Sequence, residues 1–374
     1  MDGSRGVPEA GADVTTDQLL HPARWWHRLA DGRIQCDLCP HECKLRVGQR
    51  GACFVRRRDG DQVVLTTYGL ASGFCIDPIE KKPLAHFYPG TSVLSFGTVG
   101  CNLACRYCQN WDISTSRDPE RLQDAASPDT IANAATSWGC RSVAFTYNDP
   151  VIFAEYAMDV ADACHETGLR TVAVTAGFVH ESPRREFFAH IDAANVDLKA
   201  FTEDFYASLT RSHLQPVLDT ISYLAHETSV WLELTTLLIP GHNDSTAEIS
   251  RLSTWVATEL SADVPLHFSA FHPSHHLRDV PPTSPASLSR ARHIAMESGL
   301  HHVYVGNVHD PDGETTSCSG CGAALIRRDR YRILEYRLRA DGSCPDCELA
   351  LPGRFAETAG DFGPHRIPVS IRGS

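Results

Sequence analysis

Short apolar runs rich in β-branched residues alternate with helical segments through the middle of the chain, and this alternation restricts the fold more than any other feature. It is typical of βαβ units, whose strands are parallel, and about six such units are expected. The predicted strands lie at residues 93–97, 142–147, 171–175, 196–199, 230–238, 266–271 and 302–305. We therefore predict an α/β fold with a parallel sheet or barrel.

Helix signals occupy the gaps between these runs. Ser127 is a cap residue placed before Pro128, and proline is favoured at the first helical position. Ser245 stands three residues before Glu248, as in a capping box. Gly168 marks the end of another helical segment. The connections between the predicted strands are therefore helical, as a parallel sheet requires.

Net charge and the apolar pattern disfavour several classes of protein. The 374 residues include 34 Lys and Arg against 46 Asp and Glu, which gives a net charge of -12. This sign disfavours binding to nucleic acid through phosphate contacts. Residues 1–20 lack a signal-peptide pattern, and no stretch approaches the roughly 18 apolar residues of a membrane span. We expect a cytoplasmic protein without membrane contacts.

Fourteen cysteines in a large chain without an export signal indicate metal binding rather than disulfides, because cytoplasmic thiols stay reduced. Three stand alone and are expected to pack as small apolar residues: Cys75, Cys140 and Cys164. The others form a front group of Cys36, Cys39, Cys43 and Cys53, a middle group of Cys101, Cys105 and Cys108, and a rear group of Cys318, Cys321, Cys344 and Cys347.

The middle group lies in the segment GTVGCNLACRYCQNW, residues 97–111, directly after a predicted strand. Three cysteines with this spacing can bind three irons of a [4Fe-4S] cluster and leave the fourth iron open. An open iron binds a small molecule, and the methionyl amine and carboxylate of S-adenosylmethionine (SAM) suit that role. A zinc loop would need a fourth ligand, and no candidate is close in sequence.

This loop resembles that of the radical SAM superfamily, CxxxCx(aromatic)C, with Tyr107 as the aromatic residue near the adenine. Residues 25–355 are similar to the AmmeMemoRadiSam-system radical SAM proteins, which resemble the activating enzymes of glycyl-radical enzymes. Six segments carry this resemblance, in the expected order: DPIEKKPLAHFYPG (77–90), FTYNDP (145–150), DLKAF (197–201), LLIPGHND (237–244), PLHFSAFHP (265–273) and YVGNV (304–308).

The resemblance implies a partial (β/α)6 TIM-like barrel with the cluster and SAM at the carboxyl ends of the strands. It also implies reductive cleavage of SAM to a 5′-deoxyadenosyl radical, which abstracts hydrogen from an unknown substrate, a partner protein being one candidate. A one-electron donor such as flavodoxin or ferredoxin would be required. Memo-like and AMMECR-like proteins are candidate partners. The alternative is a noncatalytic iron-sulfur or zinc protein that serves interaction or electron transfer.

The same resemblance assigns contacts with SAM. Asn148 and Asp149 end the second strand, where the superfamily often has a Gly-Gly-Glu segment that meets the SAM amine, and relatives more often have the longer Glu at Asp149. Ala176 replaces an asparagine of the family. Lys199 resembles a lysine that approaches the SAM carboxylate, although a lysine reaching solvent is the alternative. His267 could meet the SAM ribose or carboxylate, or be a hydrogen-bonded core residue.

The rear cysteines form a CxxC pair, residues 318–321 and 344–347, with a predicted hairpin at residues 326–338 between them. Four thiolates in this pattern predict a zinc ribbon, with a second iron cluster or redox dithiols as alternatives. The hairpin is rich in arginine, which we interpret as a solvated face. The front cysteines, with His41 among them, suit either a structural zinc or an auxiliary iron-sulfur cluster.

Five regions are expected from these patterns. They are a loose N-terminal tail (1–22), a Cys-rich metal-binding region (23–90), the radical SAM partial barrel (91–310), the zinc ribbon (311–355) and a C-terminal tail (356–374).

Overall fold

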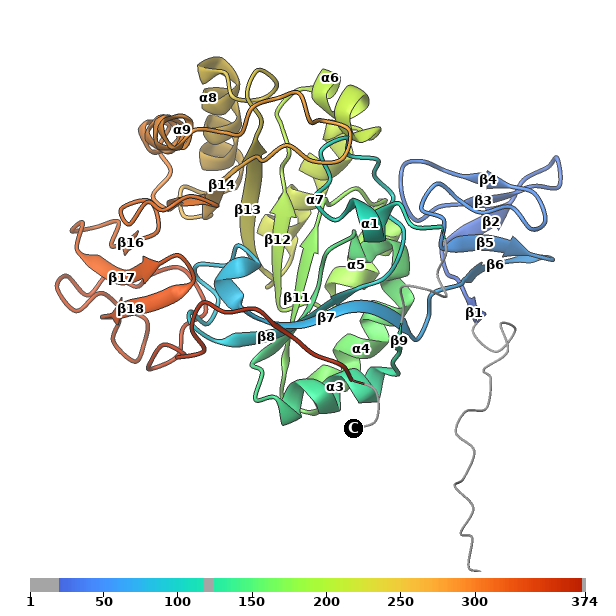
Figure 1. Cartoon of the computed structure of the whole chain (residues 1–374), viewed down its shortest axis with the longest axis horizontal. Helices are drawn as coiled ribbons and strands as arrows, with labels where there is room; N and C mark the ends of the chain where they lie inside the picture. Colours follow the sequence, from blue (N-terminus) through green and yellow to red (C-terminus); the bar gives the residue numbers. More distant parts are fainter. Residues whose placement is uncertain (1–19, 118–123, 372–374) are drawn as a thin grey trace, which may run out of the picture.

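The computed structural model describes residues 20–117 and 124–371, and its centre is a ten-stranded sheet in the order β15-β14-β13-β12-β11-β10-β8-β7-β19, with β9 paired to β7 (Figure 1). Neighbouring strands from β8 to β15 are parallel. Each of the seven predicted runs overlaps a strand: β8 (Ser92–Gly97), β10 (Ser142–Phe145), β11 (Arg170–Thr175), β12 (Ala193–Asp197), β13 (Trp231–Leu238), β14 (Leu266–Ala270) and β15 (Val303–Gly306). The run at 196–199 was placed too late, because β12 begins at Ala193 and ends at Asp197. The sheet order has two ends, so the barrel is partial.

Helices connect these strands, as predicted. The longer ones are α3 (Pro128–Ser137), α4 (Ala154–Glu166), α5 (Glu181–Phe188), α7 (Leu214–Glu227), α8 (Thr246–Trp255) and α9 (Pro285–Glu297). The short ones are η2 (Ile79–Lys81), α1 (Trp111–Ser114), η3 (Pro150–Phe153), α6 (Glu203–Phe205), η4 (Tyr206–Thr210) and η5 (Val256–Leu260). Ser127 and Ser245 cap α3 and α8. The Glu248 carboxylate accepts a bond from the Phe201 amide at 2.8 Å, so α8 has only half of the predicted capping box.

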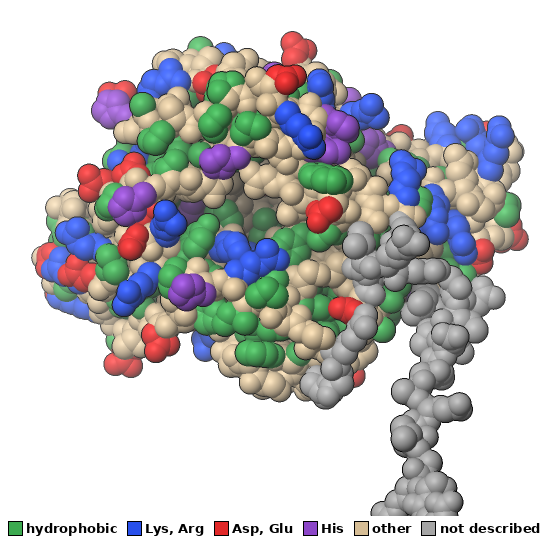
Figure 2. Space-filling view, in the orientation of Figure 1, with side chains coloured by type: hydrophobic (Ala, Val, Ile, Leu, Met, Phe, Trp, Pro, Cys, Tyr) green, Lys and Arg blue, Asp and Glu red, His purple; other side chains and the backbone are tan. Residues whose placement is uncertain are grey.

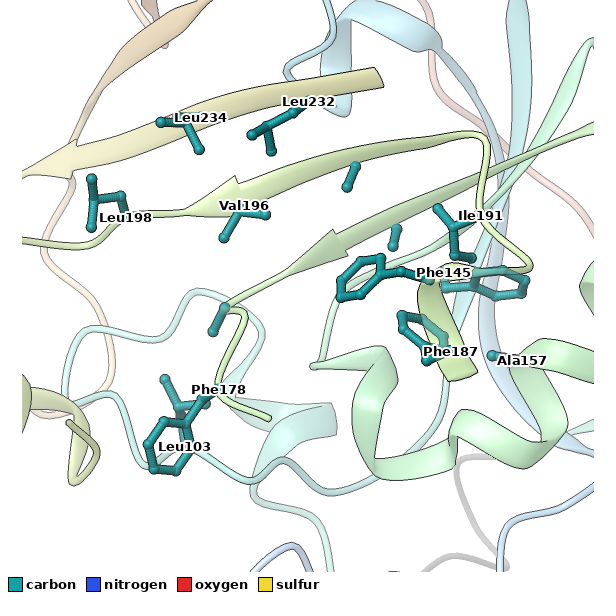
Figure 3. Close-up of a cluster of buried hydrophobic side chains, with 14 of the residues drawn as sticks. Leu103, Phe145, Ala157, Phe178, Phe187, Ile191, Val196, Leu198, Leu232 and Leu234 are labelled. Carbon is teal, nitrogen blue, oxygen red and sulfur yellow. The ribbon is translucent and has the colours of Figure 1, made fainter. Parts of the chain in front are cut away.

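The core lies between the sheet and its helices (Figure 3). Strand residues such as Val196 and Leu234 belong to the same buried cluster as aromatic side chains such as Phe145 and Phe187. Leu103 of the cysteine loop lies next to Phe178, so the loop is anchored in the same core. Within the described ranges, no helix is both long and apolar enough to cross a bilayer.

The N-terminal region forms two small antiparallel sheets, in the orders β1-β6-β5 and β2-β3-β4. Its strands are β1 (His21–Pro22), β2 (Trp26–Arg28), β3 (Ile34–Cys36), β4 (Lys44–Leu45), β5 (Arg56–Asp59) and β6 (Gln62–Leu65). A buried ion pair joins it to the barrel, because Arg56 of β5 lies 2.5 Å from the Glu155 carboxylate of α4. The Arg24 amide also donates to Glu155, at 2.7 Å.

The C-terminal region contains the predicted hairpin. Strands β16 (Thr316–Ser317), β17 (Ala324–Asp329) and β18 (Arg332–Tyr336) form an antiparallel sheet. Its small core contains Leu325, Ile326 and Leu338 together with Cys318 and Cys344. Figure 1 shows this sheet beside the barrel, on the side of β14, and near the segment that follows β7.

The prediction of a C-terminal tail was wrong for the described residues 356–371. Strand β19 (Ile367–Pro368) pairs antiparallel with β7 (Leu70–Pro78), and β9 (Asp124–Ala125) pairs with β7 as well. The segment also approaches another backbone closely, because a Cβ added to Gly360 would lie 2.4 Å from the Gly90 oxygen. Backbone pairing of this kind has no apolar period, so no local pattern predicts it.

The prediction of a loose N-terminal tail was also wrong for its last residues. His21–Pro22 forms β1, which pairs with β6. Residues 1–19 of that predicted tail lie outside the described residues.

Replacing Arg56 should destabilise the folded chain strongly. Arg56→Ala leaves the Glu155 carboxylate buried without its counter-charge, and we expect a loss of about 3–5 kcal/mol in the free energy of unfolding. Denaturant unfolding measures this loss. Arg28→Ala is the matched control, because the Arg28–Asp61 pair is exposed and should contribute under about 1 kcal/mol. Equal losses in the two variants would contradict the assigned role of the buried pair.

Candidate active site

The three middle cysteines lie at the carboxyl edge of the parallel strands, as predicted. The loop that carries Cys101, Cys105 and Cys108 follows β8 directly. All three line a cavity of about 850 Å³. Residues in or just after the six further parallel strands also line it, among them Asp149 after β10 and Lys199 after β12. Parallel pairing explains this convergence, because it brings the carboxyl ends of neighbouring strands to one edge.

Asn148 fixes the cysteine loop to the end of the neighbouring strand. Its Oδ1 accepts a bond from the Thr98 amide at 3.1 Å, and its Nδ2 donates to the Gly100 carbonyl at 2.8 Å. The backbones are so close here that a Cβ on Gly97 would lie 2.4 Å from the Thr146 oxygen. Asn148 also lines the cavity. Its contact with SAM stays a prediction, whereas its bonds to the cysteine loop are observed.

Asp149 ties the ends of two strands together. Its Oδ1 accepts bonds from the Val151 amide (3.1 Å) and the Thr175 hydroxyl (2.9 Å), and its Oδ2 accepts one from the Ala176 amide (3.0 Å). Burial raises the pKa of this carboxyl, while these bonds favour the charged form. Each carboxylate oxygen has about two acceptor positions, so among the described residues one position on Oδ2 has no donor.

Lys199 is held as a cation close to the cysteine loop. Its Nζ lies 2.8 Å from the Asp197 carboxylate, and 13% of the side chain is exposed. Burial opposes the charge, but Asp197 and the Cys105 thiol together raise the pKa of Lys199. Burial raises the pKa of the Cys105 thiol to about 11, and the positive charge of Lys199 partly offsets this rise. Lys199 therefore faces the cavity rather than open solvent.

Two further groups suit a polar ligand in this cavity. Tyr107 is buried, lines the cavity and packs against Phe205, with ring centroids 5.9 Å apart. The buried hydroxyl of Thr235 also lines it, and it has no hydrogen-bond partner among the described residues. Such an orphaned group is costly unless a ligand or water satisfies it. Sequence reasoning missed Thr235, because a threonine inside a strand carries no local signal.

His267 lies in a neighbouring cavity. Its Nε2 is 2.7 Å from the Glu233 carboxylate, and its ring stacks on Tyr304 with centroids 5.0 Å apart. Burial opposes the charge of Glu233, but the bond from His267 lowers the pKa of this carboxyl to about 2. His267 lines a second cavity of about 660 Å³ and is absent from the lining of the first.

The second cavity contains basic residues to which the sequence analysis assigned no place in a site. Lys81, Lys82 and Arg328 line it, and Figure 2 shows a hollow near the centre of the face with Lys and Arg side chains close to it. The interpretation of the arginine-rich hairpin as a solvated face was wrong for Arg328, whose side chain is 4% exposed. Strand alternation places Arg328 on the same face as Ile326 and Arg327 on the opposite face, but only the docking of the hairpin decides that the Arg328 face is covered.

The rear and front cysteines are arranged differently. All four rear sulfur atoms lie within 4.8 Å of one another, with Cys318 to Cys347 at 3.4 Å and Cys321 to Cys344 at 3.7 Å. In residues 20–117, no three front sulfur atoms come so close together. The front group lies against the middle loop, because His41 bonds to the Asn102 carbonyl at 2.6 Å.

Comparison with known proteins shows the family. The sequence model of the Radical SAM superfamily matches residues 96–252. An uncharacterized protein of Methanocaldococcus jannaschii, MJ0808, is 38% identical over 309 residues, which cover 83% of this chain and 92% of that protein.

Two activating enzymes are more distant relatives. The 4-hydroxyphenylacetate decarboxylase activating enzyme of Clostridioides difficile is 26% identical over 163 residues, 41% of this chain and about half (51%) of the relative. The pyruvate formate-lyase 1-activating enzyme of Escherichia coli is 24% identical over 173 residues, 44% of this chain and 68% of the relative. The superfamily match, with the cysteine loop inside it, and the extensive similarity to MJ0808 show that the chain belongs to the radical SAM superfamily.

Proposed function

We propose that this chain cleaves SAM reductively at a [4Fe-4S] cluster and abstracts hydrogen from a substrate held beside it. The superfamily implies the cluster and SAM. The observation that carries the proposal is the shared cavity, in which the three loop cysteines face Asp149, Lys199 and Tyr107. A protein that only carried electrons would not need this cavity or its strand-end charges, so the structure favours the enzyme over the noncatalytic alternative.

The residues of the chain have distinct roles in this proposal. Cys101, Cys105 and Cys108 would hold three irons as thiolates. When bound, the cluster and SAM supply the chemistry, in which one electron from an external donor breaks the sulfur–C5′ bond and gives methionine and a 5′-deoxyadenosyl radical. Asp149 would accept a hydrogen bond from the methionyl amine at its open Oδ2 position. Lys199 would attract the methionyl carboxylate, and the surrounding lining would exclude water.

The substrate and partners are supported less directly. Two relatives are activating enzymes by name, which makes a glycine in a partner protein one candidate substrate. Each of those matches covers less than half of this chain. Flavodoxin or ferredoxin as electron donor, and Memo-like or AMMECR-like proteins as partners, remain proposals that rest on resemblance.

We also propose a structural zinc at the rear cysteines. Zinc–sulfur bonds of about 2.3 Å place tetrahedral thiolates roughly 3.8 Å apart. The closest sulfur pairs, at 3.4 and 3.7 Å, fit that geometry. The wider spacing of the front sulfur atoms favours an auxiliary iron-sulfur cluster over zinc in that group.

The first prediction tests the loop cysteines. Replacing Cys101, Cys105 or Cys108 by alanine should abolish formation of 5′-deoxyadenosine from SAM, because each change removes one of three thiolates. The measurement is product analysis of anaerobically reconstituted protein with dithionite. Cys140→Ala is the matched control and should keep full activity, since this lone cysteine packs in the core. Product formation by a loop variant would overturn the proposal.

A second prediction concerns Asp149. Asp149→Ala should weaken SAM binding by about 10- to 150-fold, because a charge-assisted hydrogen bond is worth about 1.5–3 kcal/mol. Equilibrium binding with matched iron content measures it. Thr175→Val separates ligand contact from strand tethering, because it removes a bond to Asp149 but keeps the carboxylate, and it should bind SAM nearly as the parent does. Unchanged affinity in Asp149→Ala would exclude the contact.

A third prediction concerns the rear metal. Cys344→Ser should lower the zinc content by about one equivalent and make residues 311–355 more sensitive to protease, because ribbon folding is coupled to metal binding. Metal analysis and limited proteolysis measure the two effects. Cys140→Ser should retain the parental zinc content. Equal zinc content in Cys344→Ser and the parent would refute the assignment.

A further inference from the structure

The second cavity is built from parts of the chain that are far apart in sequence. The segment after β7 contributes Lys81 and Lys82, the hairpin contributes Arg328 and Arg330, and the C-terminal segment contributes Arg366. The two cavities share six lining residues: Gln109, Asn110, Thr146, Tyr147, Ser269 and Asn307. The second cavity is therefore continuous with the one that contains the cysteines, and a molecule in it would lie beside the site of radical formation.

Positive charge dominates this cavity. Five basic side chains and two carboxylates line it, although the whole chain has a net charge of -12. Lys81 and Lys82 share one carboxylate, that of Asp77, at 2.9 and 2.7 Å. Within the described residues, no ion pair or hydrogen bond engages the side chain of Arg330. Against these five cations stand the carboxylates of Glu80, Glu314 and the adjacent Asp77, so the cavity keeps an excess of positive charge that an anionic ligand would balance.

Two buried polar atoms in this cavity also have no partner. The Arg328 guanidinium donates to the Ala85 carbonyl at 2.7 Å and to the Thr316 hydroxyl at 2.8 Å, but its Nε is unbonded among the described residues. Oε2 of Glu80 also has no hydrogen-bond partner among the described residues, and Oε1 of Glu80 lies 3.9 Å from Nε of Arg328. Burial raises the pKa of Glu80 to about 7, which weakens its compensation of Arg328 near neutral pH. Buried groups left in this state usually bind a ligand or water.

We propose that the second cavity binds the substrate through an anionic group, a carboxylate or a phosphate, recognised by Lys81, Arg328 and Arg330. The inference rests on the proposed function, which places hydrogen abstraction in the adjoining cavity. A volume of about 660 Å³ is that of a small-molecule site, so this proposal favours a small organic anion over a glycine in a partner protein as the substrate. The rings of Tyr147, Tyr304 and Tyr331 offer its carbon skeleton an apolar surface. In this arrangement the hairpin is a wall of the substrate site.

Anion binding by the full, anaerobically reconstituted chain tests the proposal. Inorganic phosphate and succinate are titrated separately at constant ionic strength, with chloride as the reference, and the shift of the thermal unfolding midpoint gives an apparent Kd. We expect saturable stabilisation by at least one of them. A response to phosphate alone indicates a phosphorylated substrate, and a response to succinate alone indicates a carboxylate. Arg330→Gln and Lys81→Gln should each raise the apparent Kd roughly 10-fold, since each removes a charged hydrogen-bond donor.

Arg327→Gln is the matched control. Arg327 lies on the same hairpin but outside the cavity lining, and it pairs with Glu335 at 2.9 Å. This variant should respond to anions as the parent does. The proposal is overturned if neither anion stabilises the parent more than chloride does. It is also overturned if Arg327→Gln raises the apparent Kd for the anion as much as Arg330→Gln does. The assay contains neither SAM nor reductant, so its failure leaves the proposed SAM chemistry standing, and failure of SAM cleavage leaves anion binding standing.

Discussion

Parallel pairing of the strands from β8 to β15 is the constraint on which the rest of the structure depends. It sends the carboxyl end of every one of these strands to the same edge. The cysteine loop, Asp149 and Lys199 meet there although they follow different strands. The chemistry therefore draws its residues from separate βα units, and each unit contributes one or two side chains at a fixed place.

Side chains that line the cavity also hold the strand ends in place through hydrogen bonds. Asn148 holds the cysteine loop through Gly100, and Asp149 holds the end of β11 through Thr175 and Ala176. These bonds form within the protein alone. A ligand entering the cavity would thus meet groups whose positions are already fixed, which reduces the ordering cost of binding.

The outer regions belong to the same structural unit as the barrel. The buried pair of Arg56 and Glu155 docks the N-terminal sheets on α4, and His41 reaches the Asn102 carbonyl beside the cysteine loop. On the other side, Arg328 of the hairpin donates to the Ala85 carbonyl. The region with the front cysteines therefore contacts the cysteine loop, and the region with the rear cysteines contacts the second cavity. Metal binding in either region would stabilise the residues around these cavities.

The sequence by itself determined the α/β class, the seven strands, the cysteine loop and the hairpin, because apolar periodicity, caps and cysteine spacing are local signals. Its resemblance to the radical SAM superfamily also pointed to Asp149 and Lys199. Only the tertiary structure decided the pairing of β19 with β7 and the basic cavity. Arg328 and Ala85 are 243 residues apart in sequence, and their contact arises from the docking of the hairpin on the barrel. A local pattern cannot encode such a contact, since burial and charge balance depend on the whole fold.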